Sequence, residues 1–267
     1  MGSAMMLLAL MQAGAAAQPA PAPAQLLTML AKEDGQHCLD EQRLCLAVRA
    51  SGDGDPRSAA LVLSDGTEGS ELPIELPPFE QTADNLSLWP QLIPVSDTAP
   101  GGGTSWLVGI IERQSLMYSG GGGSVSRLHL FRVALAPHAY RLSAELLSLP
   151  WASSRMIRAC FSERDGERRR GACHDEYDFG ASLTLEAGPA GAGEWPSLVY
   201  RTQATAYPQT ARRGEDSSAA PPLRPSDLSH WRDPDCSFTR RFAYNELTGR
   251  YEADRGGPAG CESYWGP

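Results

Sequence analysis

Six cysteines in three neighbouring pairs constrain the fold of this chain more than any other feature of its sequence. They stand at positions 38, 45, 160, 173, 236 and 261. Many pairings are open in principle, but the short separations favour Cys38–Cys45, Cys160–Cys173 and Cys236–Cys261. A zinc site is the alternative, yet such sites usually place cysteines or histidines closer together than these spacings do. We therefore predict three local disulfides and an oxidising compartment.

The N-terminus predicts export. Residues 4–11 form a short apolar run, and small residues at 14–17 offer an Ala-x-Ala cleavage site after Ala17. This arrangement is typical of a secretory signal peptide, although no Lys or Arg precedes the run. An apolar tail without signal function is the alternative. We assign 1–17 to a signal peptide and 18–24 to an extended Pro/Ala spacer, and we expect a periplasmic or secreted protein.

A membrane anchor is not expected from the sequence. The apolar run near the N-terminus is shorter than the roughly 20 residues that cross a bilayer as a helix. No later segment is long and apolar enough to qualify. The mature chain is therefore expected to be soluble.

The composition favours short strands joined by many turns. The chain has 27 glycines and 21 prolines among 267 residues, well above the roughly 12% of average proteins. Strand-like segments at 43–50, 59–63 and 72–76 are separated by turn residues, a spacing typical of sandwiches, barrels and propellers. We predict a single all-β domain over residues 25–267, an antiparallel sandwich or an irregular propeller-like meander. A long loop is expected at 208–227.

Two further expectations concern particular segments. Residues 24–34 carry Leu26, Leu27 and Leu30 on one face of a potential short helix. Residues 105–118 are apolar on both faces near 107–111, which indicates a central strand. The glycines at 120–123 then predict a mobile hairpin tip. A phosphate-binding loop is disfavoured there because a strand pattern follows instead of a helix.

The last hairpin carries a resemblance. Residues 242–251 read Phe-Ala-Tyr-Asn-Glu-Leu-Thr-Gly-Arg-Tyr. The pattern Phe-x-Tyr-Asn-x-x-Thr-Gly-x-Tyr resembles the closing hairpins of bacterial exported β proteins, some of them propeller-like. The resemblance covers this hairpin alone and implies a fold class without a function.

The hairpin that Cys160 and Cys173 would close holds the densest group of charged residues. Its candidate binding residues are Arg164, Arg168, Arg169, Arg170, His174, Asp175 and Glu176. On a strand, His174, Glu176 and Asp178 would share one face, and Asp175 would point the other way. Salt bridges between these acids and the arginines are the favoured interpretation. A divalent cation on the three-residue face and a partner-binding tip are the alternatives.

Catalytic signatures are missing from the sequence. It contains no Gly-x-Ser-x-Gly, Ser-x-x-Lys or His-Glu-x-x-His motif and no calcium loop of the EF-hand type. We therefore predict no catalytic residues, no metal and no cofactor. A net charge of -9 argues against nucleic acid as a partner.

Two functions remain open. The favoured one is a non-enzymatic exported protein that binds a cell-envelope glycan or a protein partner. The alternative is an envelope hydrolase that acts on a polysaccharide through paired carboxylates. The sequence does not set an oligomeric state.

Overall fold

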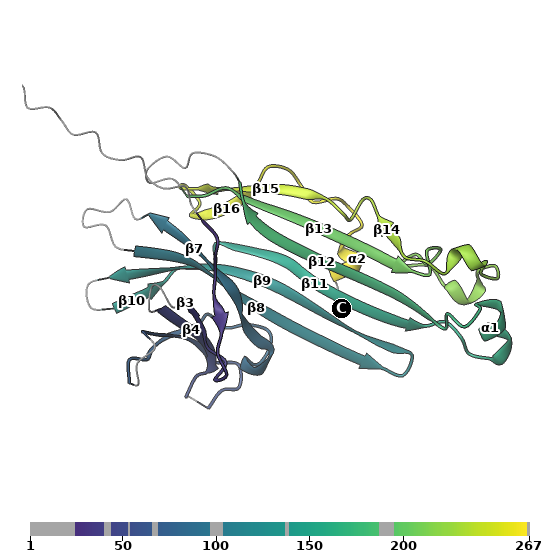
Figure 1. Ribbon diagram of the computed structural model, residues 1–267, viewed down its shortest axis with the longest axis horizontal. Helices are drawn as coiled ribbons and strands as arrows, with labels where there is room; N and C mark the ends of the chain where they lie inside the picture. Colours follow the sequence, from purple (N-terminus) through teal and green to yellow (C-terminus); the bar gives the residue numbers. More distant parts are fainter. Residues whose placement is uncertain are drawn as a thin grey trace, which may run out of the picture.

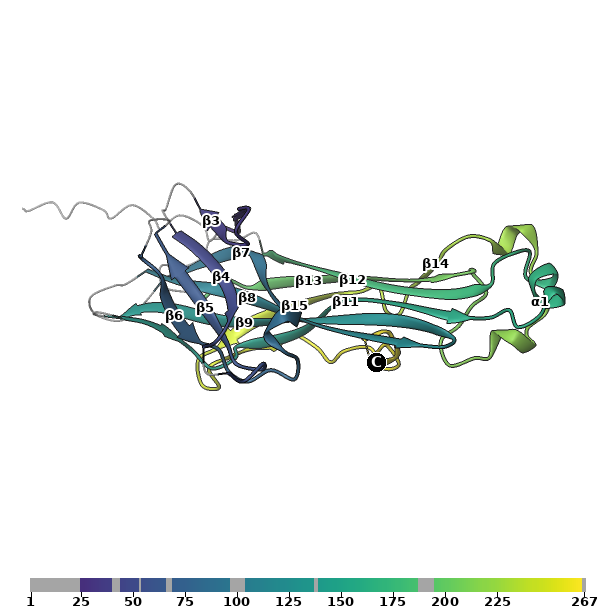
Figure 2. The same cartoon turned by 90° about the horizontal axis from the view of Figure 1, so that it is seen from below.

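Two antiparallel sheets of unequal size build the molecule. The computed structural model describes residues 25–39, 44–52, 54–65, 69–96, 104–136, 139–186 and 195–265. Within them, one sheet has 11 strands and the other has five. The long sheet extends far beyond the region that the small sheet covers, so the molecule is elongated (Figures 1 and 2). The prediction of a mostly antiparallel β fold is confirmed, and the two packed sheets fit the sandwich alternative.

Both sheets are largely meanders, in which strands adjacent in sequence pair with each other. The small sheet contains, in order, β2 (Leu30–Ala31), β3 (His37–Leu39), β4 (Leu44–Ala50), β5 (Ala59–Ser64) and β6 (Leu72–Glu75). The long sheet runs β1 (Leu27–Thr28), β7 (Leu86–Ser96), β8 (Thr104–Tyr118), β9 (Gly121–Ala136), β11 (Leu147–Arg158), β12 (His174–Leu185), β13 (Leu198–Tyr207), β15 (Thr239–Asn245) and β16 (Arg250–Ala253). Two short strands lie beside this order, β10 (Ala139–Leu142) on β9 and β14 (Trp231–Asp233) on β13.

Helical segments are short and lie between strands or after them. They are the turns η2 (Ala83–Asn85), η3 (Ser217–Ala219) and η4 (Pro225–Asp227) and the helices α1 (Glu163–Arg168) and α2 (Glu262–Trp265). None of the helices in the described part of the chain has the length and apolarity needed to cross a membrane.

Strands β7–β9 are buried on both faces around residues 107–110 of β8. Val108 and Ile110 pack with residues of β4 and β5 in one hydrophobic cluster. Leu107 and Leu128 point the other way, into a second cluster with residues of β12, β13, β15 and β16. Alternate side chains of one strand therefore serve two cores, which is possible only where a sheet is covered on both sides. The prediction of a central strand near residues 107–111 is confirmed.

The predicted N-terminal helix at 24–34 is wrong. Residues 27 and 28 pair with Leu92 and Gln91 of β7, and residues 30 and 31 pair with β3. Between them, the buried Met29 donates its backbone N–H to the carbonyl of Pro90 at 3.0 Å. The segment thus passes from one sheet edge to the other. Backbone partners on both sheets outweigh the weak helical preference of a few spaced leucines.

The mobile hairpin tip predicted for the glycines at 120–123 is wrong in its extent, because most of these glycines belong to a strand. Strand β9 begins at Gly121, so the turn after β8 consists of Ser119 and Gly120. Gly121 has φ +155°, and a Cβ atom there would collide with the carbonyl oxygen of Met156 on β11. The missing side chain at Gly121 therefore lets β9 and β11 approach closely.

All three predicted disulfides are present, and the described chain has no free cysteine. Cys38–Cys45 joins β3 to β4, and Cys160–Cys173 closes the hairpin of β11 and β12. Cys236–Cys261 ties the segment before β15 to the start of α2. Such a set is typical of proteins outside the cytoplasm. The predicted signal peptide and spacer lie outside the described residues.

Contacts from the C-terminal part close the fold. Tyr251 of β16 donates its backbone N–H to the carbonyl of Leu146 at 3.0 Å. The Ser153 hydroxyl on β11 donates to the carbonyl of Tyr264 in α2 at 2.5 Å. Strands from the middle of the chain are thereby covered by its last described elements.

Candidate functional site

The predicted arginine tip contacts a distant loop of the same chain. Helix α1 caps the β11–β12 hairpin at the far end of the molecule, beside residues 208–227 (Figure 2). Arg168 donates from Nη2 to the carbonyl of Ala220 at 2.7 Å, and Arg170 donates from Nε to that of Leu223 at 3.0 Å. The Leu223 amide returns a hydrogen bond to the Arg168 carbonyl at 2.9 Å. These side chains therefore hold the loop in place.

Arg169 and Asp175 form a buried ion pair beneath this contact. Arg169 also donates from Nε to the carbonyl of Ala172 at 2.8 Å. The second oxygen of Asp175 accepts a hydrogen bond from the Ser217 hydroxyl in η3. The favoured salt-bridge interpretation is thus confirmed for this pair, whereas Arg168 and Arg170 use backbone carbonyls instead.

The remaining predicted residues lie nearer the surface. His174 and Glu176 are half-buried and Asp178 is exposed, on the strand face opposite Asp175 as the alternation predicted. Arg164 on α1 is exposed. Among the described residues, no three His, Cys, Asp or Glu side chains are grouped to hold a metal ion. Binding of a partner by the predicted residues stays a prediction. They are Arg164, Arg168, Arg169, Arg170, His174, Asp175 and Glu176.

A groove that the sequence did not reveal lies over β8 and β9. Its volume is about 660 Å³, and its lining includes the segment 77–81 after β6 and Trp265 of α2. The lining combines aromatic with charged and polar side chains. They include Phe79, Glu112, Gln114, Arg127, His129, Glu145 and Trp265.

His129 lies in this groove between two carboxylates. It is 7% exposed, and its Nδ1 lies 2.5 Å from Oε2 of Glu145. Its Nε2 lies 3.4 Å from Oε2 of Glu112, without hydrogen-bond geometry. The other oxygen of Glu112 accepts a hydrogen bond from the backbone N–H of Gln81 at 2.9 Å. The ring of Phe79 packs edge-on against the imidazole, with the two ring centroids 5.1 Å apart. The imidazole is therefore fixed from three sides.

The hydrogen bond from His129 holds the pKa of Glu145 below its ordinary value of 4.5, with smaller help from Arg250 and Arg127. A depressed folded-state pKa stabilises the fold above 4.5, and this contribution is lost as the pH falls through the folded value. We expect Glu145→Gln to lower the urea midpoint near neutral pH and to lower it by a smaller amount at an acidic pH below 4.5.

The control for this test is Glu246→Gln in the exposed turn between β15 and β16, which should match the wild type at both pH values. An equal loss for Glu145→Gln at both pH values would show that packing, not the charge, is responsible.

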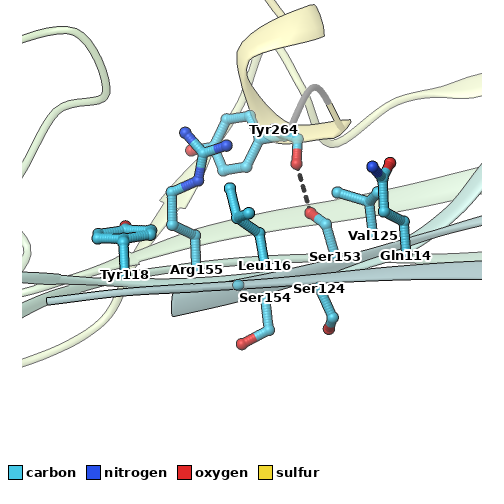
Figure 3. Close-up of a pocket in the computed structure, with 10 residues that line it drawn as sticks. Gln114, Leu116, Tyr118, Ser124, Val125, Ser153, Ser154, Arg155 and Tyr264 are labelled. Carbon is cyan, nitrogen blue, oxygen red and sulfur yellow. Dashed lines mark hydrogen bonds between the residues drawn. The ribbon is translucent and has the colours of Figure 1, made fainter. Parts of the chain in front are cut away.

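A smaller pocket lies farther along the same sheet (Figure 3). Leu116, Tyr118 and Arg155 project toward the side where Tyr264 lies, and Ser124 and Ser154 point to the opposite face. Helix α2 therefore lies on the face of β8 from which Leu116 and Tyr118 project.

Comparisons with protein-family models, with curated proteins and with solved structures give no match to this chain. The site must therefore be interpreted from its own geometry.

Proposed function

We propose that this chain is an exported, non-enzymatic binding protein that takes a cell-envelope glycan into the groove over β8 and β9. The observation that carries the proposal is the lining of that groove. Phe79 and Trp265 offer aromatic surface, and Glu112, Gln114 and Arg127 offer charged and amide groups. Aromatic rings pack on the apolar faces of sugars, and convergent polar groups bond their hydroxyls.

Binding is favoured over hydrolysis by the state of the carboxylates. A glycosidase needs one carboxyl group that stays protonated as the general acid. The pKa of Glu145 is instead lowered by its hydrogen bond with His129, so Glu145 is ionised at neutral pH. Both carboxylates also approach the same imidazole, and Glu112 is further held by the Gln81 amide. These contacts suit a fixed binding surface better than an acid–base pair.

The test is a titration of the oxidised protein with soluble peptidoglycan fragments and with neutral oligosaccharides, followed by tryptophan fluorescence and calorimetry. We expect saturable binding that Glu112→Gln and Arg127→Ala each weaken by about tenfold, or about 1.4 kcal/mol. Glu246→Gln, outside the groove, should bind like the wild type.

Two results would overturn the proposal. One is the absence of binding by any of these glycans while the protein is folded. The other is release of new reducing ends that Glu112→Gln abolishes, which would establish the hydrolase alternative.

A further inference from the structure

One edge of the long sheet is free over part of β8. Strand β7 pairs with β8 only as far as Leu86 opposite Glu112. On its other side, β8 continues to pair with β9 up to Tyr118 opposite Gly121. Residues 113–118 therefore have no strand on their outer side within the described part of the chain, and Figure 1 shows this end of β8 at the margin of the sheet.

This free edge is apolar. Leu116, Met117 and Tyr118 are 52%, 83% and 42% exposed. Arg113 at the inner end is the charged residue of this edge, and residues 114–118 contain no charge and no proline. Sheet edges are usually protected from association by charges, prolines, bulges or covering segments. Residues 114–118 lack charges and prolines and are therefore suited to pairing with another strand.

We propose that two copies of this chain pair through this edge, β8 against β8, in a two-fold symmetric dimer with one continuous sheet. The proposal does not rest on glycan binding, although Gln114 belongs both to the groove and to this edge. Antiparallel pairing about a two-fold axis gives both copies the same contacts. It also brings no like charges together, because residues 114–118 are uncharged. The partner is therefore a second copy.

The length of the free edge selects the register. Residues directly opposite each other share a face of the sheet, so a residue on the two-fold axis faces itself. With Leu116 on the axis, Gln114 lies opposite Tyr118 and Ser115 lies opposite Met117 of the second copy. The hairpin turn of the second copy then ends beside Leu86, the first residue of β7, which already pairs with Glu112. With Ser115 on the axis, Tyr118 of the second copy would need the place that Leu86 occupies.

The side chains suit this register. Leu116 and Tyr118 project on the same face of β8 (Figure 3), so both copies contribute them to one apolar strip. On the opposite face, the long Met117 side chain would pack over the small Ser115 of the second copy. The three exposed large hydrophobic side chains of the edge would thus be covered together.

Cysteine cross-linking tests the register. The native cysteines are all bonded within the described chain, so an introduced cysteine supplies the free thiol. We expect Leu116→Cys, on the axis, to form a disulfide-linked dimer on mild oxidation at least tenfold faster than Ser115→Cys. Leu247→Cys, at a site 98% exposed in a distant turn, serves as the control for random collisions. Cross-linking of Leu116→Cys at the rate of Leu247→Cys would overturn the proposal.

Mass measurement by light scattering tests association itself. The wild type should show about twice the mass of Met117→Lys at the same concentration, and Leu247→Lys should match the wild type. A wild type that stays monomeric at its highest soluble concentration would overturn the proposal. Met117 does not line the groove, so glycan titration of Met117→Lys reports separately on the proposed function.

Discussion

Arg169→Ala is expected to lower the free energy of unfolding by about 3–5 kcal/mol, the usual cost of removing one partner of a buried ion pair. Among the described residues, the loss would leave the buried Asp175 carboxylate with the Ser217 hydroxyl as its remaining polar partner. It would also remove the hydrogen bond from Arg169 Nη1 to the Ser217 carbonyl, at 3.3 Å, and so loosen residues 208–227. Urea unfolding of the oxidised protein measures the effect.

Arg164→Ala is the matched control, because Arg164 belongs to the same charged tip but is exposed. Its effect should stay within about 0.5 kcal/mol. Replacing Arg169 and Asp175 together by apolar residues of similar size should recover much of the loss, because no unpaired charge remains buried. Equal stability of Arg169→Ala and Arg164→Ala would contradict the buried pair.

Gly109→Ala is expected to cost about 1–3 kcal/mol through overpacking. Gly109 lies in β8 opposite Leu130, where the added Cβ would stand 2.7 Å from Cβ of Trp89 and 2.8 Å from Cδ1 of Leu128. Neither neighbour can move freely, because both are buried in the core cluster. Urea unfolding gives the cost, and near-ultraviolet circular dichroism shows whether Trp89 has shifted.

Gly180→Ala on β12 is the control for strand propensity. No heavy atom lies within 4 Å of the position that its Cβ would take. This substitution should be neutral or should stabilise the fold by up to about 1 kcal/mol, because alanine restricts the unfolded chain. If both alanine variants behaved alike, close packing around Gly109 would not be the reason for its glycine.

The features that the sequence predicted correctly depend on neighbours along the chain. The disulfide pairs follow from short separations, and the last hairpin from its turn residues at 245–249. The double burial of residues 107–111 follows from an apolar run without alternation. Each of these signals lies within one or two strands.

The groove could not be predicted because its residues come together through strand register. Glu112 belongs to β8, His129 to β9, and Glu145 to the segment before β11. No spacing in the sequence marks them as a set. The local signal was His129, which stands between two fully buried residues, Leu128 and Leu130. The carbonyl contacts of the tip arginines could not be predicted for a related reason, since their partners come from the loop at 217–223.

The closure between β11 and α2 has a consequence for how the chain is made. Strands β7 to β13 each find a partner in the strand just before them or just after, so they can add to the sheet in the order in which they are synthesised. The Ser153–Tyr264 contact instead spans 111 residues. A ribosome-bound chain that has emerged only through β13 therefore still exposes aromatic surface, including Phe179, which Trp265 contacts in the finished fold. A chaperone that recognises apolar surface would have its best opportunity in that interval, before the last elements emerge.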